Sequence, residues 1–210
     1  MTDPANASPR IEEKEDGPIL VHNATGMIGT DGKPVEIKET MSLCRCGRSS
    51  TKPFCDGTHR KTGFKSRTEN EPSGKDKLRS YEGSDQTVLY NARLCSHAAQ
   101  CVKLAPEAFT TGEAPWIKPD KAEDTKLPAV IRACPSGALQ MEDQGHLIPD
   151  RVTVHVEKDG PYWITGAWID APLDAKGATK DKYVLCRCGL SGMKPFCDGT
   201  HHNEKWSDDD

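Results

Sequence analysis

Two stretches of the chain decide its fold. Residues 43–59 read LCRCGRSSTKPFCDGTH, and residues 185–201 read LCRCGLSGMKPFCDGTH. The two stretches are identical at fourteen of their seventeen positions. About 25 residues before the first cysteine of each stretch lies a Gly-Pro pair with a short apolar run, Ile19–Val21 in one case and Tyr162–Ile164 in the other. The chain therefore uses a small unit of roughly 45 residues twice.

Each copy carries the spacing Cys-x-Cys-x8-Cys-x3-His, which is a set of metal ligands. Cys44 and Cys46 are two residues apart, so an extended or turning backbone directs both side chains to one side. Cys55 and His59 are four residues apart and share a face if a helical turn begins near Asp56, a suitable N-cap. The spacing predicts one iron held by two thiolates and a second held by a thiolate and an imidazole. A structural zinc site accepts the same ligand set, and spacing alone does not exclude it.

The residues around these ligands carry a specific resemblance. A serine, a proline and the string Cys-Asp-Gly-Thr-His recur at fixed positions in both copies and resemble the signature of the CDGSH, or NEET, iron–sulfur domain. The resemblance implies a 2Fe–2S cluster in each copy, held by three cysteines and one histidine, and a monomer in which the two copies pack as a pseudo-two-fold pair. The ligands that it implies are Cys44, Cys46, Cys55, His59, Cys186, Cys188, Cys197 and His201.

The segment between the copies holds the other three cysteines. Residues 90–109 read YNARLCSHAAQCVKLAPEAF, and residues 131–139 read IRACPSGAL. Together they resemble a divergent, single-cluster ferredoxin-like domain of bacteria, with Ala98 at the usual middle cysteine position. The ligands that this resemblance implies are Cys95, Cys101 and Cys134. Three thiolates fit a 3Fe–4S cluster, whereas a 4Fe–4S cluster needs a fourth ligand, for which His97 is the nearest candidate. A zinc site, or a domain without a cluster, is the remaining alternative.

The expected fold class is α+β, with two small β-rich CDGSH units and an inserted ferredoxin-like domain. We expect the two units to pack on each other, because each is too small to bury its own strands. Strands are predicted at residues 152–156 and 162–169, and a helix at 127–133. The predicted divisions are a disordered tail (1–16), the first CDGSH domain (17–68), a linker (69–87), the ferredoxin-like domain (88–142), the second CDGSH domain (143–206) and an acidic tail (207–210).

Composition narrows the class of protein further. Only 35% of the 210 residues are hydrophobic, so the core is thin and bound metal is a plausible source of stability. The nine cysteines are an odd number, which excludes a complete disulfide framework. A net charge of −4 argues against nucleic-acid binding. No long apolar run or secretory signal is present, so we expect no membrane association and a cytoplasmic location, where thiols stay reduced.

Electron transfer is the function that this sequence favours. The three sites use all nine cysteines, and no nucleotide-binding motif or nucleophile–base arrangement stands out, so we expect no enzyme activity. The partner would be another redox protein. The alternative is a module for cluster storage, for transfer to an apo iron–sulfur acceptor or for redox and pH sensing, because protons compete with iron for the single histidine ligand. Of the other histidines, we expect His155 and His202 to lie at the surface.

Overall fold

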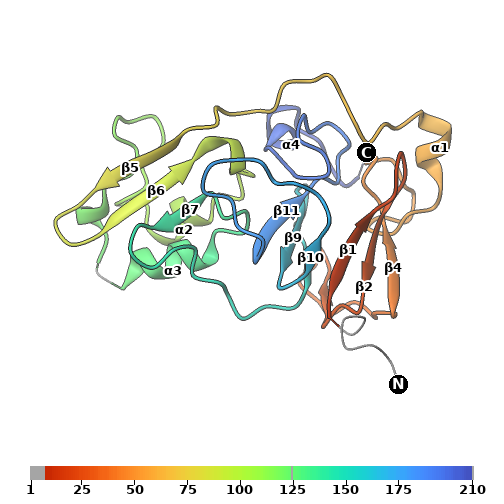
Figure 1. Ribbon diagram of the computed structural model, residues 1–210, viewed down its shortest axis with the longest axis horizontal. Coiled ribbons are helices and arrows are strands. Elements are labelled where there is room, and N and C mark those ends of the chain that lie inside the picture. Colours follow the sequence, from red (N-terminus) through yellow and green to blue (C-terminus); the bar gives the residue numbers. More distant parts are fainter. Residues whose placement is uncertain (1–7, 124, 210) are drawn as a thin grey trace.

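The computed structural model describes residues 8–123 and 125–209 of the chain. The two repeats form one lobe, and the segment between them forms a second lobe toward the other end of the longest axis (Figure 1). These residues build three small sheets and four short α-helices, which confirms the α+β class. The longest helix of this part of the chain has eight residues, and none of its helices could cross a bilayer, which takes about 20.

The two repeats contain the same series of elements, namely four strands and a short helix after the last cysteine. The elements of the first copy are β1 (Arg10–Glu13), β2 (Ile19–His22), β3 (Met27–Ile28), β4 (Thr40–Leu43) and α1 (Thr58–Thr62). Those of the second copy are β8 (Val154–Val156), β9 (Tyr162–Thr165), β10 (Trp168–Ile169), β11 (Lys182–Leu185) and α4 (Thr200–Asn203). The repetition seen in the sequence therefore extends to the whole fold of each unit.

The two copies exchange strands. One sheet has the order β10-β1-β2-β4 and the other has the order β11-β9-β8-β3, so each sheet takes its edge strand from the opposite copy. Both exchanged strands pair in parallel, with Arg10 opposite Trp168 and Met27 opposite Val154. Because the exchange is reciprocal, the copies cannot separate without losing a strand from each sheet. It supports the predicted pseudo-two-fold pair, while the symmetry itself stays a prediction.

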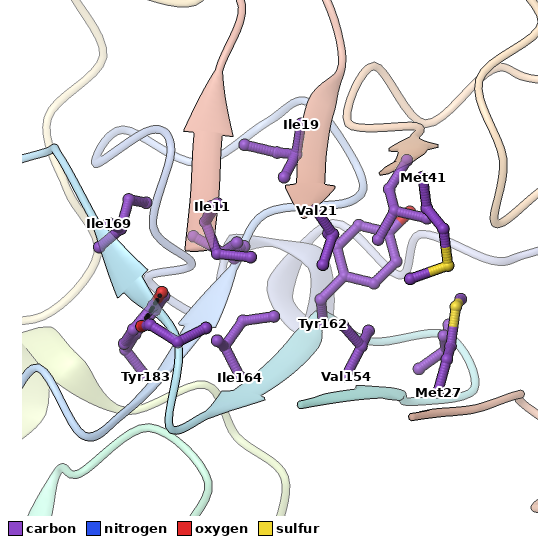
Figure 2. Close-up of a cluster of buried hydrophobic side chains, with 14 of the residues drawn as sticks. Ile11, Ile19, Val21, Met27, Met41, Val154, Tyr162, Ile164, Ile169 and Tyr183 are labelled. Atoms are coloured by element: carbon purple, nitrogen blue, oxygen red, sulfur yellow. Dashed lines mark hydrogen bonds between the residues drawn. The ribbon is translucent and has the colours of Figure 1, made fainter. Parts of the chain in front are cut away.

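A single hydrophobic core joins the copies (Figure 2). Along β2, Ile19 and Val21 are fully buried while the residues between and after them are only partly buried, as the alternation of a strand requires. Across from them, β9 contributes Tyr162 and Ile164, which are also fully buried. Apolar side chains from both copies thus fill one space, which confirms the expected packing of the units on each other.

The middle lobe has its own core and its own sheet. Its elements are β5 (Leu78–Glu82), β6 (Thr87–Asn91), the 3-10 turns η2 (Ala92–Leu94) and η3 (Pro119–Lys121), α2 (Gln100–Leu104), α3 (Lys126–Ala133) and β7 (Leu139–Met141). The strands are antiparallel in the order β5-β6-β7. Helix α3 confirms the helix predicted at 127–133, and it buries Leu127, Val130 and Ile131 in this core.

The structure differs from the expected divisions at both ends of the first CDGSH domain. The disordered tail predicted at 1–16 is wrong for its described part, because β1 pairs with β2 and β10 inside a sheet; residues 1–7 lie outside the described residues. Only Ile11 of this strand is buried, so the local pattern was weak. The predicted linker, 69–87, contains β5 and the first residue of β6. Strand β5 has few apolar residues and is held mainly by its pairing with β6.

Two further expectations need correction in the second copy, and the predicted acidic tail makes a contact with it. The strand predicted at 162–169 is broken at Gly166, whose φ of 65° turns the chain between β9 and β10. In the acidic tail predicted at 207–210, Asp208 forms an ion pair with the buried Arg187; residue 210 lies outside the described residues. His155 is half-buried and stacks on Trp163, with ring centroids 4.6 Å apart, because the side chain that faces away from the core meets this aromatic ring.

Candidate metal centres

The structure brings together the four candidate ligands of the first copy as two pairs. Cys44 and Cys46 follow β4, and their Sγ atoms are 3.6 Å apart. Cys55 Sγ lies 3.3 Å from Nδ1 of His59, which stands on α1. The two cysteines that follow β4 are buried, whereas Cys55 and His59 are partly exposed. Each pair offers the two protein ligands that one iron of a two-iron cluster takes.

The second copy repeats this arrangement in a more buried setting. The Sγ atoms of Cys186 and Cys188 are 3.7 Å apart, and Cys197 Sγ lies 3.3 Å from Nδ1 of His201. All four side chains are buried; Cys197 is 2% exposed and His201 7% exposed. Burial is also the main reason why the pKa of His201 falls to about 4, which keeps this imidazole in its neutral, ligating form.

The grouping into pairs bears on the kind of metal site that spacing left open. A tetrahedral zinc site takes four ligands around a single ion. A 2Fe–2S cluster places two irons side by side, with one pair of protein ligands on each. Both copies present their candidate ligands as two pairs, which fits a two-iron cluster.

The signature residues between the ligands hold the loop in shape. Ser49 Oγ donates to the carbonyl oxygen of Phe54 at 2.6 Å, across the turn. The Asp56 carboxylate accepts backbone N–H groups from Ser50 and Thr58, both at 2.9 Å, and these bonds hold the pKa of Asp56 well below its usual range. The second copy has the same bonds, from Ser191 to Phe196 and from Gly192 and Thr200 to Asp198. The N-cap of α1 is Gly57, not Asp56 as the sequence predicted; Asp56, one residue earlier, accepts the first N–H of the helix and fastens the loop before it.

Hydrogen bonds also act on the thiols themselves. In each copy the first two cysteines share an S–H···S hydrogen bond, with Sγ atoms 3.6 and 3.7 Å apart. The shared proton lowers the pKa of one thiol of the pair and raises that of the other. Iron binds thiolates rather than thiols, so the hydrogen bond favours the ligating form of one sulfur in each pair.

The three cysteines of the middle lobe line one hollow. Cys95 follows η2, Cys101 lies on α2, and Cys134 follows α3, and all three face a space that Tyr90 and Trp116 also line. The Tyr90 hydroxyl is hydrogen-bonded to the thiol of Cys95. Burial raises the pKa of Cys101 to about 12, as is expected of a thiol in apolar surroundings. Helices α2 and α3 pack together and so bring these distant cysteines to one place.

Comparison with known proteins assigns the repeated unit. The family described as "Iron-binding zinc finger CDGSH type" matches residues 16–60 and again residues 159–202. The chain belongs to the CDGSH family. Between its two CDGSH units, residues 81–144 match the family described as "Divergent 4Fe-4S mono-cluster". The order predicted from the sequence is confirmed: this CDGSH protein is an iron–sulfur protein with a divergent mono-cluster domain inserted between the repeats.

Two curated relatives share one portion of this CDGSH protein. Both are named "Uncharacterized protein YjdI", one from Escherichia coli strain K12 and the other from Escherichia coli O157:H7. Each is 37% identical over 62 residues, which is 30% of this chain and 82% of the relative. The likeness therefore covers most of a small protein but less than a third of this one.

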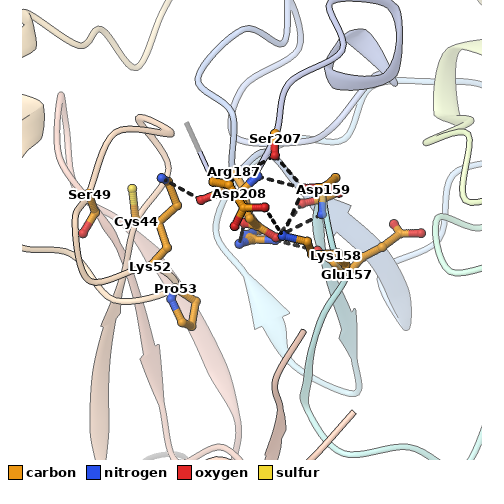
Figure 3. Close-up of polar contacts among 12 residues, drawn as sticks. Cys44, Ser49, Lys52, Pro53, Glu157, Lys158, Asp159, Arg187, Ser207 and Asp208 are labelled. Carbon is orange, nitrogen blue, oxygen red and sulfur yellow. Dashed lines mark hydrogen bonds and ion pairs between the residues drawn. The ribbon is translucent and has the colours of Figure 1, made fainter. Parts of the chain in front are cut away.

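A buried arginine stands between the first two ligands of each CDGSH copy, and sequence reasoning gave it no role. In an extended backbone the residue between two ligands faces the opposite side, so Arg45 and Arg187 point into the protein. Arg45 Nε donates to the carbonyl oxygen of Gly17 at 2.6 Å. Arg187 donates to the carbonyl oxygen of Glu157 at 2.6 Å and pairs with Asp208 (Figure 3). The signal in the sequence is the Cys-Arg-Cys alternation itself.

The two CDGSH sites touch through their glycines. A Cβ atom on Gly47 would lie 2.6 Å from the carbonyl oxygen of Cys188, and one on Gly189 would lie 2.9 Å from that of Cys46. Such distances are too short for any side chain, so only glycine lets the two ligand loops approach this closely. Both contacts involve the backbone of a candidate ligand. The two CDGSH sites are therefore direct neighbours.

The middle site touches the second CDGSH site. A Cβ atom on Gly199 would lie 2.9 Å from the carbonyl oxygen of Cys95 and 2.3 Å from Cδ2 of His97. The His97 ring also stacks on His202, with centroids 5.0 Å apart. The Cδ2–Nε2 edge of the His97 ring, the candidate fourth ligand, is thus turned toward the second CDGSH site. Ala98, at the position of the absent cysteine, packs against the cluster of side chains that includes Cys197.

Proposed function

We propose that this CDGSH protein carries electrons between redox protein partners through three iron–sulfur clusters. Two would be 2Fe–2S clusters, each with three cysteine ligands and one histidine, and the third would be a 3Fe–4S or 4Fe–4S cluster in the middle domain. The proposal rests on the direct contacts between neighbouring sites. The middle site contacts the second CDGSH site at Gly199, and the second contacts the first at Gly47 and Gly189.

Hydrogen bonds and ligand types at the sites would set the reduction potentials of three neighbouring clusters. Bound clusters supply one-electron chemistry, and their potentials depend on ligand type, burial and hydrogen bonds to sulfur. Backbone N–H groups of Leu190 and Gly199 donate to the thiols of Cys188 and Cys197, both at 3.4 Å. Such bonds and a neutral imidazole ligand both favour the reduced cluster, which supports a higher potential at the CDGSH sites than at the all-thiolate middle site.

The size of the middle cluster can be determined by analysis of the purified protein. Three cysteines line the hollow, which supports the three-iron form; His97 also lines it, with the Cδ2–Nε2 edge of its ring against Gly199. The family description names a 4Fe-4S cluster, which supports the four-iron form. Iron and acid-labile sulfide analysis of anaerobically purified protein separates them: about seven irons per chain indicate 3Fe–4S and about eight indicate 4Fe–4S.

Two matched variants test electron exchange between the sites. Gly199 and Gly57 occupy the same position in the two copies, with φ of 85° and 88°, but a Cβ atom on Gly57 would meet nothing within 4 Å. We expect Gly199→Ala to push the middle domain away and to slow electron exchange with the second cluster, and Gly57→Ala to leave it unchanged. Partly reduced protein, freeze-quenched and studied by electron paramagnetic resonance, measures this rate. Electrons that never redistribute among the clusters of the wild-type protein would overturn the proposal.

Cluster transfer is a second candidate, and the exposure of the first site favours it. Cys55 and His59 are partly exposed, whereas their counterparts Cys197 and His201 are buried. An apo acceptor could reach the first pair of ligands but not the second. Incubation with an apo-ferredoxin, followed by native gel electrophoresis, tests it: the acceptor should gain colour at the expense of the first cluster only.

A further inference from the structure

The first CDGSH site is the one through which electrons would leave or enter the protein. Its outer ligands, Cys55 and His59, are partly exposed, and the space over Gly57 is open. The equivalent face of the second site is closed, because Gly199 lies against Cys95 and His97. A protein partner can therefore approach the first site directly, and what surrounds that site decides which partner fits.

Three exposed cations surround the first site. Arg48 follows the second ligand by two residues, and its backbone N–H is hydrogen-bonded to the Cys46 thiol. Arg60 and Lys61 follow His59 on α1, and all three side chains are exposed. We call these three residues the basic rim. Within the part of the chain that the structure describes, none of the ion pairs involves a residue of the basic rim.

The acidic side chains near the rim have other partners. The Asp56 carboxylate accepts N–H groups of its own loop, as described above. Asp16 pairs with Lys65, and Asp208 pairs with Arg187. The ionised carboxylate of Asp56 lies in the same loop, but the three positive charges of the basic rim outnumber it, while Asp16 and Asp208 are paired elsewhere. This matters because the chain as a whole has a net charge of −4 and would otherwise repel anions.

The second copy lacks the basic rim at the same positions. Leu190, His202 and Asn203 stand where the first copy has the two arginines and the lysine. The cation that follows this segment, Lys205, stands directly after Glu204. The loops are otherwise nearly identical, so the folding of the motif does not require the three cations. They distinguish the open site from the closed one.

We propose that the basic rim docks an acidic electron-transfer protein over the first cluster. This inference rests on the proposed function, because it names the partner surface for the electrons that the clusters would carry. Carboxylates around the partner's own cofactor would face the rim, and the attraction would raise the association rate at low ionic strength. The partly exposed Cys55 and His59 would then lie under the partner, which gives the shortest route between the two cofactors.

The test uses variants that the second copy itself suggests. Arg48→Leu, Arg60→His and Lys61→Asn together replace the basic rim with the residues that the second copy has at the same positions. A control variant, Arg79→Leu with Lys77→Asn and Lys121→His, removes the same formal charge from exposed positions of the middle lobe. Strand β5 lies at the opposite end of the molecule from α1, so the control leaves the first site untouched (Figure 1).

The rates at which charged oxidants react with the full-length, cluster-loaded protein show how much the basic rim attracts an anion. After reduction, the protein is mixed in a stopped-flow instrument with ferricyanide, an anion, or with tris(phenanthroline)cobalt(III), a cation. We expect the rim variant to react about ten-fold more slowly with ferricyanide at low ionic strength and no more slowly with the cobalt complex, whereas the control changes by less than about two-fold. Cytochrome b5, an acidic haem protein, should bind immobilised wild type and the control more tightly than the rim variant.

The outcomes separate this inference from the proposed function. Equal rates for the rim variant and the control would overturn the docking surface, because only net charge would then matter. If the docking surface is right but the clusters do not exchange electrons, oxidation becomes multiphasic and only the phase of the first cluster responds to the rim. If electron exchange is right and the docking surface is wrong, all clusters oxidise together and at the same rate in the rim variant and in the control.

Discussion

Gly199 of the second CDGSH copy lies against the backbone of Cys95 in the middle site, so closely that a Cβ atom would be 2.9 Å from the Cys95 carbonyl oxygen. The equivalent residue of the first copy, Gly57, faces open space. Two nearly identical motifs therefore differ in what covers them. This contact and the stacking of His97 on His202 join the middle site to the second CDGSH site, while the first CDGSH site stays open.

The stability of the two glycine variants should follow this difference. Both Gly199→Ala and Gly57→Ala place a side chain at positive φ, which costs about 1–2 kcal/mol. Gly199→Ala adds overpacking against Cys95 and His97, typically about 1–3 kcal/mol more. We expect the thermal midpoint of Gly199→Ala to fall by several degrees more than that of Gly57→Ala, as differential scanning calorimetry can measure. Equal midpoints would contradict the contact.

Tyr162 supports the first CDGSH site from the second copy. Its buried hydroxyl donates to the carbonyl oxygen of Cys44 at 2.7 Å and to that of Pro53 at 2.9 Å. Removing the hydroxyl in Tyr162→Phe leaves these buried acceptors without that donor, at a cost of about 1–3 kcal/mol. We expect lower stability in denaturant together with faster loss of the first cluster, followed by visible absorbance.

Tyr183→Phe is the matched control for this variant. Tyr183 is equally buried, but its hydroxyl donates to the carbonyl oxygen of Ala167 at 2.9 Å, which belongs to no ligand loop. It should lower stability to a similar degree without a selective effect on the first cluster. A loss of the first cluster that is equally fast in both variants would show that Tyr162 acts through general stability alone.

Lys182 ties the second CDGSH unit to the middle domain. Its buried Nζ donates to the carbonyl oxygens of Ile131 and His146, both at 2.6 Å. Lys182→Met would leave these buried oxygens without that donor, and an unsatisfied buried acceptor costs about 1–3 kcal/mol. Chemical denaturation should show the loss, while Lys180→Met, at an exposed position, should change little. Unchanged stability in Lys182→Met would contradict the role of this bond.

The same lysine predicts a dependence of stability on pH. Burial lowers the pKa of Lys182 from 10.5 to about 8. Between these values the unfolded chain binds more protons than the folded one, so the free energy of unfolding should rise with pH from about 8 to 10.5 and be insensitive to this group below 8. Unfolding measured across that window should show the rise in wild type, and Lys182→Met should remove that part of it.

Removal of iron should proceed in two phases. Cys55 and His59 are partly exposed while Cys197 and His201 are buried, so a chelator should reach the first cluster sooner. We expect a fast phase that is absent in Cys55→Ser, which cannot complete the first site, and that persists in Cys197→Ser. Absorbance of an iron–chelator complex at constant pH measures both phases. A single phase in wild type would show that exposure does not control access to the iron.

Much of the site was predictable from short-range features of the sequence. The pairing of Cys44 with Cys46 and of Cys55 with His59 depends only on backbone geometry over a few residues, and the structure shows both pairs. Helix α3 follows from its own pattern of apolar residues. The presence of three sites follows from the repeat and from the three cysteines between its copies. These features need no contact between distant parts of the chain.

The relations among the sites were decided by the tertiary structure. The strand exchange through β3 and β10 and the supporting bond from Tyr162 join residues more than a hundred positions apart. Strand β1 has one buried apolar side chain, so its place in a sheet depends on partners that no local pattern reveals. Two motifs that match at fourteen of seventeen positions end in different surroundings. The residues that can hold iron follow from the spacing of ligands along the chain, which is a local property. Which CDGSH site is covered and which is open depends on where the middle lobe packs, because burial is a property of the whole fold.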